Sequence, residues 1–226
     1  MTAIRIVLVG AGRFSEEVTD VALDAGFEVR GWIEGIDPSR ADPRHEPPII
    51  WVDDQARFEP DLRIVPAIGS VRRRPLVERL LAEGRELATV IHPSAIIARS
   101  AELEPGCVVL PNVVIGARTR IGAGTILNRG VLVGHHTTIG SGCFLGPGAN
   151  VAGGIMIGDD VFLAIGSVVR DDRTIGTGAL VGAGAVVVDD VEAGSVVMGV
   201  PARPVESRSD GVGRYQAPTS SRNQAS

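Results

Sequence analysis

The chain has 226 residues, of which 44% are hydrophobic and only 4% aromatic, and its formal net charge is −5. The acidic balance and the scarcity of aromatic rings argue against nucleic-acid binding, which relies on basic stripes and stacking. No run of 18 apolar residues could span a membrane, and the apolar run at 6–9 is too short for a secretion signal. We therefore expect a cytoplasmic protein with room for two modest domains.

Residues 1–88 predict a small α/β domain of the Rossmann-like class. Residues 4–10 are typical of a buried strand, residues 16–25 of a helix, and residues 27–33 of a second strand that is closed by Glu34. With the Gly-rich turn between the first strand and the helix, this order contains part of the dinucleotide fingerprint. The free N–H groups at the start of such a helix can receive a phosphate.

The fingerprint is incomplete, because Ser15 replaces its third small residue and the domain is too short for a second mononucleotide half. NAD is therefore disfavoured, while another nucleotide or phosphate ligand and a turn that serves packing alone both stay open. After a Pro-rich loop at 36–48, strands are expected at 49–52 and 63–69 and a helix at 71–83. The result would be a sheet of three to five strands.

A six-residue repeat dominates the chain from residue 91 to residue 198. Every sixth residue from Ile91 to Ala193 is Ile, Leu or Val in seventeen of eighteen cases, with Ala193 the exception. Six is the period of neither an α-helix nor a two-sided sheet, but it is the period of a solenoid whose faces are short strands. Three hexads would close a triangular coil of 18 residues, so eighteen hexads predict six coils in one unbroken register.

The other positions of the hexad fit such a coil. Four residues after each aliphatic comes a small or aliphatic residue that can fill the interior near a corner, and glycine, which eases tight turns, often follows the aliphatic itself. Arg173 breaks this rule, so either the coil loosens near Asp171 and Asp172 or Arg173 pairs with them. The solenoid domain should span residues 89–205, and the polar residues 206–226 are typical of a disordered tail.

The two cysteines, Cys107 and Cys143, both take the small inward position and are 36 residues, or two coils, apart. At the usual strand separation their Cα atoms would lie about 9–10 Å apart, which is too far for a disulfide. A thiol buried among apolar side chains is also a poor nucleophile. We therefore expect structural cysteines and no acyl-cysteine intermediate.

Of the adjacent histidines His135 and His136, His135 is the candidate catalytic residue, because it takes the outward corner position of its hexad, where a substrate can reach it, and imidazole can take a proton near pH 7. One coil later lies Gly153, whose backbone should sit about 5 Å from His135, where its N–H could hold a carbonyl oxygen. An exposed histidine pair without a role is the alternative. Zinc would need three ligands, and a third at suitable spacing is missing, so no metal is predicted.

Six motifs carry a more specific resemblance. They are VGAG at 9–12, AIGS at 67–70, IHPSA at 91–95, ILN at 126–128, VGHH at 133–136 and GVPA at 199–202. With these motifs, residues 4–205 resemble the bacterial sugar acetyltransferases of the sialic-acid O-acetyltransferase and UDP-amino-sugar (bacillosamine-type) N-acetyltransferase family. That family joins a small nucleotide-binding α/β domain to a left-handed parallel β-helix.

The resemblance implies an acetyl-CoA-dependent homotrimer with each active site between neighbouring subunits. In it, His135 would be the general base and Asn128 an active-site residue, while Gly153 would bind the acetyl carbonyl and Ala183 would line the pantetheine groove. The nucleotide of the sugar donor would bind at Gly10, Gly12, Arg13, Phe14 and Glu34.

Two departures from the family pattern affect the expected function. The family usually follows its histidine with an acid, but here His136 follows, and the second strand ends in one acid instead of two. We expect direct acetyl transfer to the amino group of a nucleotide-linked amino sugar. O-acetylation of a sialic-acid-type sugar and a catalytically inactive binding module are the alternatives.

Overall fold

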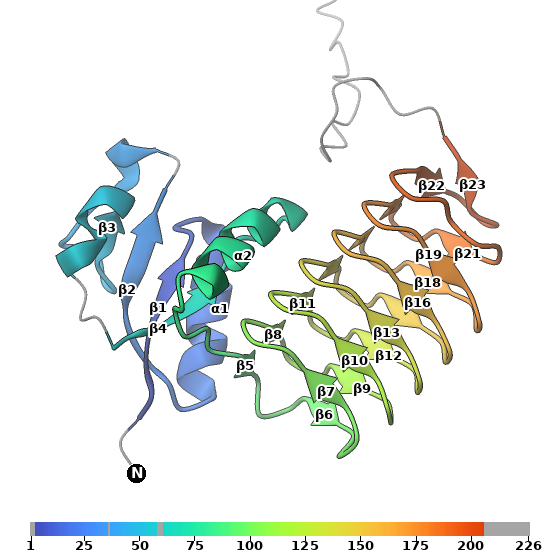
Figure 1. Ribbon diagram of the computed structural model, residues 1–226, viewed down its shortest axis with the longest axis horizontal. Helices are drawn as coiled ribbons and strands as arrows, with labels where there is room; N and C mark the ends of the chain where they lie inside the picture. The colour runs from blue at the N-terminus through green and yellow to red at the C-terminus, as the bar shows by residue number, and fades with distance from the viewer. Residues whose placement is uncertain (1–2, 36, 58–60, 206–226) are drawn as a thin grey trace, which may run out of the picture.

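The computed structural model describes residues 3–35, 37–57 and 61–205, so the predicted tail at 206–226 lies outside the described residues. Figure 1 shows an N-terminal α/β unit beside one end of a column of stacked short strands. No helix in the described ranges has the length and apolar character needed to cross a bilayer.

The N-terminal unit is a four-stranded parallel sheet in the order β3-β2-β1-β4. Its strands are β1 (Arg5–Val9), β2 (Glu28–Glu34), β3 (Ile49–Trp51) and β4 (Arg63–Pro66), its α-helices are α1 (Arg13–Asp24) and α2 (Arg74–Ala82), and its 3-10 turns are η1 (Pro38–Arg40), η2 (Val52–Arg57) and η3 (Val71–Arg73). Alternate residues of β1 point to opposite faces: Leu8 packs with Val18 of α1, whereas Val7 packs with Leu80 of α2. The four strands fall within the predicted three to five.

Three boundaries differ from the expectation by three residues. The strand expected at 63–69 ends at Pro66. Helix α1 begins at Arg13 instead of residue 16, because Gly12 is extended (φ −101°, ψ 177°) and acts as the N-cap. Residues 71–73 form the 3-10 turn η3, and the α-helix begins only at Arg74, next to a proline in its first turn.

The column has three parallel sheets, one for each face of a triangular coil. We call the sheet next to the N-terminal unit the covered face; its strands are β5 (Val90–Ile91), β8 (Val108–Val109), β11 (Ile126–Leu127), β14 (Phe144–Leu145), β17 (Phe162–Leu163), β20 (Leu180–Val181), β22 (Val196–Met198) and the antiparallel β23 (Arg203–Pro204). The apolar face contains β6 (Ile96–Ile97), β9 (Val114–Ile115), β12 (Leu132–Val133), β15 (Asn150–Val151), β18 (Val168–Val169) and β21 (Val186–Val187). The polar face contains β7 (Glu102–Leu103), β10 (Arg120–Ile121), β13 (Thr138–Ile139), β16 (Met156–Ile157) and β19 (Thr174–Ile175).

The hexad register holds up to Val187 and then shifts, which corrects the prediction of an unbroken repeat. Up to that point, strands in register are 18 residues apart, as in the pairing of Ile121 with Ile139. In the last coil, Val181 pairs with Val197 and Ile175 with Val191, a spacing of only 16 residues. Val191 is therefore the inward aliphatic, and Ala193, predicted to point inward, is exposed. The corner before Val191 is two residues shorter than the others.

The inward side chains form one continuous aliphatic core, in which Leu127, Leu145 and Leu163 are fully buried in consecutive coils. Both cysteines are free and buried, as predicted. Arg173 remains partly exposed, with its guanidinium 3.8 Å from the Asp190 carboxylate and its Nε donating to the Asp171 carbonyl. Arg173 thus pairs with an acid of the following coil rather than with the carboxylates of Asp171 or Asp172.

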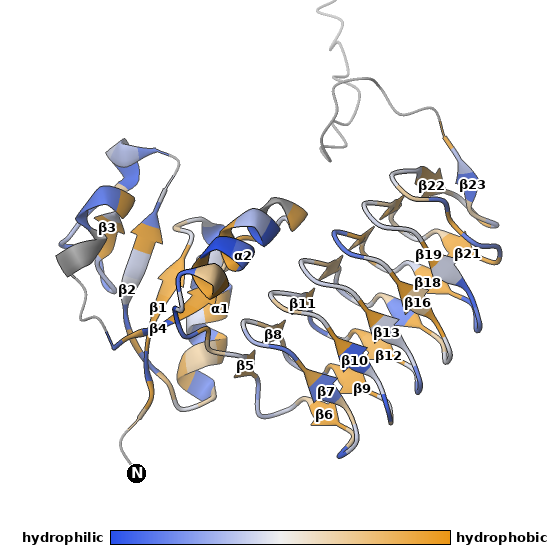
Figure 2. Ribbon diagram, viewed as in Figure 1, coloured by the Kyte–Doolittle hydropathy of each residue, from blue (hydrophilic) through white to orange (hydrophobic). Residues whose placement is uncertain are grey.

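The outward residues give the faces different characters. On the apolar face, the side chains of Ile96, Leu132 and Val168 are 66%, 42% and 37% exposed. Figure 2 shows strands β6, β9 and β12 in orange, whereas β7 and β10 of the polar face are partly blue. On the covered face, Phe144 is buried and packs with the N-terminal unit.

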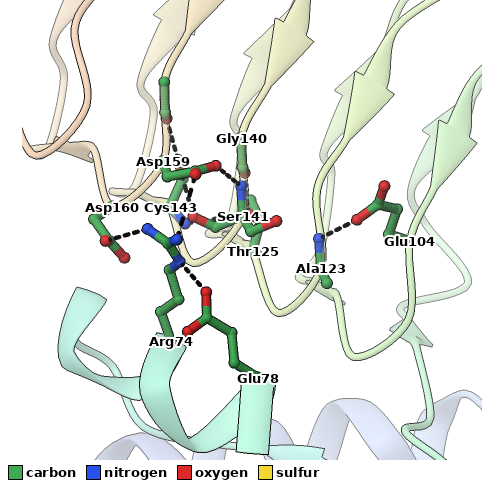
Figure 3. A network of polar contacts seen from close by, with 11 residues as sticks. Arg74, Glu78, Glu104, Ala123, Thr125, Gly140, Ser141, Cys143, Asp159 and Asp160 are labelled. Atoms are coloured by element: carbon green, nitrogen blue, oxygen red, sulfur yellow. Dashed lines mark hydrogen bonds and ion pairs between the residues drawn. The ribbon is translucent and has the colours of Figure 1, made fainter. Parts of the chain in front are cut away.

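Arg74 of α2 fastens the N-terminal unit to the column (Figure 3). Arg74 lies 2.7 Å from an oxygen of Asp160 and 3.5 Å from Asp159, and it also pairs with Glu78 on its own helix. Asp159 in turn accepts a hydrogen bond from the Ser141 N–H at 2.8 Å. These contacts place α2 against the corner between the polar and covered faces.

Candidate active site

His135 lies at the corner between the apolar and polar faces, and its ring packs against Gly153 on the next coil. The Gly154 N–H donates to the His135 carbonyl at 2.9 Å, which continues the ladder between the two coils. A Cβ added at Gly153 would lie 2.8 Å from Cε1 of His135 and 3.1 Å from each ring nitrogen. Only glycine at this position leaves room for the imidazole. Within the described residues, the Gly153 N–H donates to no protein acceptor.

His136 is the direct polar partner of His135. The Nδ1 atoms of the two rings are 3.0 Å apart, and the ring planes are nearly perpendicular, at 86°. Both side chains are exposed. At 3.0 Å the two nitrogens share one hydrogen, so one ring donates and the other accepts.

Asn128 lies at a different corner, between the covered and apolar faces. Its side chain is 4% exposed, and its Oδ1 accepts from the Arg129 N–H at 2.8 Å. Arg129 also forms an ion pair with Glu17 of α1 at 2.8 Å, which ties this corner to the N-terminal unit. Strand β12 of the apolar face separates Asn128 from His135 along the chain, so one chain does not bring these two residues together.

Ala183 belongs to the same corner as Asn128, three coils after Arg129 in the 18-residue register. Ile165, one coil before Ala183, is 58% exposed at this corner, and Ala183 is exposed too. The corner therefore offers a small apolar strip along the column.

The β1–α1 turn brings the predicted nucleotide-binding residues to the covered face. Gly10 has φ +119°, and a Cβ there would lie 2.9 Å from the Ala67 carbonyl oxygen, so the turn requires glycine. Phe14 meets Phe144 edge to face at 6.3 Å. Phe144 in turn stacks on Phe162 at 5.0 Å. Arg13, the first residue of α1, is exposed.

Arg40, the last residue of η1, contacts this turn, which the sequence did not indicate. Its guanidinium lies 3.2 Å from the carboxylate of Glu34, whose side chain is only 3% exposed, and it donates to the carbonyl of Ala11. Gly12 faces the same guanidinium, since a Cβ there would lie 3.9 Å from Nη2. The predicted acid at the end of β2 is thus already neutralised by a cation from η1.

Among residues 3–35, 37–57 and 61–205, no cluster of three His, Cys, Asp or Glu side chains could hold a metal ion.

The predicted site residues form two groups in one chain. His135 and Gly153 make one corner, while Asn128 and Ala183 belong to the corner at the other edge of the apolar face, and the β1–α1 turn packs on the adjoining covered face.

Comparison with known proteins agrees with this architecture. The family described as "Bacterial transferase hexapeptide (six repeats)" matches residues 94–129 and 118–153. A perosamine N-acetyltransferase from Caulobacter crescentus, solved as a histidine-to-asparagine mutant with CoA and GDP-perosamine, is 33% identical, with a TM-score of 0.83 over 89% of this chain and 97% of that chain. The chain belongs to the sugar N-acetyltransferase family.

Two more solved structures are similar to the present chain over most of its length. The acetyltransferase domain of PglB from Neisseria gonorrhoeae, in complex with acetyl coenzyme A, is 29% identical, with a TM-score of 0.83 over 90% of this chain and 100% of that one. WeeI from Acinetobacter baumannii is 28% identical, with a TM-score of 0.79 over 90% and 100%. The hexapeptide repeats and parallel strands fit a left-handed β-helix. A search among curated proteins finds no match.

Proposed function

We propose that this protein transfers the acetyl group of acetyl-CoA directly to the amino group of a nucleotide-linked amino sugar, with His135 as the general base. The observation that carries the proposal is the imidazole of His135 packed against the Gly153 backbone. A base and an N–H donor at one point are what acyl transfer to an amine requires. The similar perosamine N-acetyltransferase, solved with CoA and GDP-perosamine, supports this substrate class.

The chemistry follows from these two groups. The amine nitrogen attacks the thioester carbon, its proton passes to Nε2 of His135, and the carbon–sulfur bond breaks to release CoA. The Gly153 N–H would stabilise the negative charge that develops on the carbonyl oxygen. Cys107 and Cys143 are buried in the column, which favours direct transfer over an acyl-enzyme route.

We infer that the active unit is a homotrimer whose sites lie between subunits. The exposed side chains of Ile96, Leu132 and Val168 make most of one face of the column apolar, with Asn150 as an exposed polar exception, and packing this face against copies of itself would remove these side chains from water. His135 stands at one edge of the apolar face and Asn128 at the other. Packing around a threefold axis would bring the His135 corner of one subunit to the Asn128 corner of its neighbour.

The test is acetyl-CoA consumption with a panel of UDP-, dTDP- and GDP-linked amino sugars and their hydroxyl analogues. His135→Ala should lower kcat by roughly 10²–10⁴-fold while CoA still binds. Arg120→Ala, on the polar face, is the matched surface control and should leave kcat unchanged. Full activity in His135→Ala would refute the assignment. Transfer to hydroxyl acceptors alone would instead indicate an O-acetyltransferase, and no consumption with any acceptor a binding module.

A further inference from the structure

We propose that His136 is the positioning residue for His135: its neutral Nδ1 accepts the Nδ1–H of His135 and so leaves the Nε2 lone pair of His135 free to take the proton of the acceptor amine. This inference rests on the proposed function and adds to it the group that orients the base. The observation behind it is the 3.0 Å contact between the two Nδ1 atoms, with the rings at 86° to each other.

The backbone holds His136 in place for this contact. His136 has φ +56°, in the left-handed region, at a corner where Gly154 of the next coil has φ +72°. Its N–H donates to the Ala117 carbonyl at 2.9 Å. A histidine in this conformation is sterically costly compared with glycine, yet here it turns the ring toward its neighbour.

The hydrogen bond fixes the tautomer of the base. A neutral imidazole has one N–H and one lone pair, so a partner that accepts at Nδ1 places the lone pair at Nε2. When Nε2 takes the proton from the amine, His135 becomes an imidazolium, and its Nδ1–H bond to His136 becomes charge-assisted. The proton then leaves Nε2 for the thiolate of CoA, which restores the starting tautomer.

A neutral acceptor differs from a carboxylate in how it responds to pH. Protonated His136 has donors on both nitrogens, so it can no longer accept from His135, and its charge opposes protonation of the base. The charged residues in register with His136 are Arg118, one coil before, and Asp172, two coils after, and Asp172 is flanked at this corner by Arg170, Asp171 and Arg173. Arg170 pairs with Asp171 and Arg173 with Asp190, and within the described residues none of these five forms an ion pair with His136.

Three substitutions of His136 test whether its side chain acts as a hydrogen-bond acceptor for His135 or only fills space beside it. His136→Gly suits the positive φ and removes the acceptor, and it should lower kcat by about 10- to 100-fold, the range for losing one hydrogen bond to a charged group. His136→Asn offers a neutral acceptor and tolerates the same φ, so it should retain kcat within about threefold. His136→Asp should retain activity but move the acid limb of the pH profile to higher pH, because a carboxylate raises the pKa of a neighbouring imidazole.

The tautomer gives a readout that does not depend on turnover. Nitrogen-15 NMR of the free full-length protein should show His135 with its hydrogen on Nδ1 in the wild type and in His136→Asn, and predominantly on Nε2 in His136→Gly. Unchanged kcat in His136→Gly, equal losses in the Gly and Asn variants, or an Nε2–H tautomer in the wild type would each overturn the proposal. Failure of the wild type to acetylate any sugar would refute the proposed function alone, since the NMR result stands apart from it.

Discussion

Nε of Arg73 lies 2.7 Å from the carbonyl oxygen of Gly124, so a side chain of the N-terminal unit penetrates the corner of the column. The guanidinium also donates to the carbonyls of Gly142, Cys143 and Ser70, and the residue is fully buried. Burial lowers the pKa of Arg73 to about 10, so the cation persists at neutral pH. Carbonyl oxygens of two coils and of Ser70, which precedes η3, surround this charge.

Arg73→Leu should therefore destabilise the protein by about 2–4 kcal/mol, because it leaves several buried carbonyl groups without donors. The measurement is urea or thermal unfolding. Arg79→Leu, in which an exposed arginine of α2 is replaced, is the control and should change the free energy of unfolding by less than about 0.5 kcal/mol. Equal stability of both variants would show that the Arg73 contacts contribute nothing.

The sequence predicted the column well because its repeat depends only on which residues point inward. The sequence does not reveal the register shift after Val187, because Val191 also fits the small inward position of an uninterrupted hexad. Arg73 and Arg40 could not be anticipated, since each acts through contacts with distant backbone that follow no period: Arg73 reaches Gly124 and Arg40 reaches Ala11. Three consecutive arginines at 72–74 gave no sign that one of them is buried.

For the candidate site, the 18-residue register was enough to place Gly153 next to His135. It could not reveal the hydrogen bond between His135 and His136, because side-chain torsions decide that contact. Nor could it show that Glu34 is paired with Arg40, which comes from a loop with no regular pattern.

Gly153→Ala should reduce kcat with little effect on folding. The three heavy atoms nearest to the added methyl would all belong to the ring of His135, with Cε1 at 2.8 Å, so it is this ring that must move. A displacement of about 1 Å at a catalytic group can cost about 10²-fold in rate. Gly134→Ala is the contrasting variant: its methyl would lie 2.5 Å from the backbone of Ala152 and Gly153, so it should lower the Tm instead. Wild-type kcat in Gly153→Ala would argue against a catalytic role for this corner.

The two cysteines should give the stability a distinct dependence on alkaline pH. Burial raises the pKa of Cys107 and of Cys143 from 9.0 to about 12. Below pH 9 both thiols are protonated in the folded and unfolded chains alike. Between pH 9 and 12 the unfolded chain loses these protons while the folded chain keeps them, so the free energy of unfolding falls as pH rises.

Few other side chains of this protein titrate near pH 10, because the sequence contains no lysine and a single tyrosine. Arg73, with its pKa of about 10, acts in the opposite direction above that pH, so the clearest window is pH 9 to 10. Urea unfolding should show a fall in stability across this window in the wild type and a flatter profile in the Cys107→Ala, Cys143→Ala double variant. Identical stability profiles for the wild type and the double variant would contradict the prediction and mean that the thiols are accessible in the folded protein. Rapid alkylation of the folded protein at pH 8 would lead to the same conclusion.

The separation of His135 and Asn128 onto two edges of the apolar face predicts complementation between subunits. His135→Ala and Asn128→Ala should each be nearly inactive alone. In trimers mixed at equal ratio, a site is intact when the Asn128→Ala chain supplies His135 and its neighbour, the His135→Ala chain, supplies Asn128. That arrangement occurs at about one quarter of the sites for random assembly of a cyclic trimer.

Co-refolded mixtures should thus recover up to about 25% of wild-type activity. As a control, His135→Ala mixed with the double variant His135→Ala, Asn128→Ala should recover none, because no chain supplies the histidine. Sedimentation would confirm that the mixtures are trimers. If both residues acted within one chain, mixing the single variants would restore nothing, and the intersubunit site would have to be abandoned.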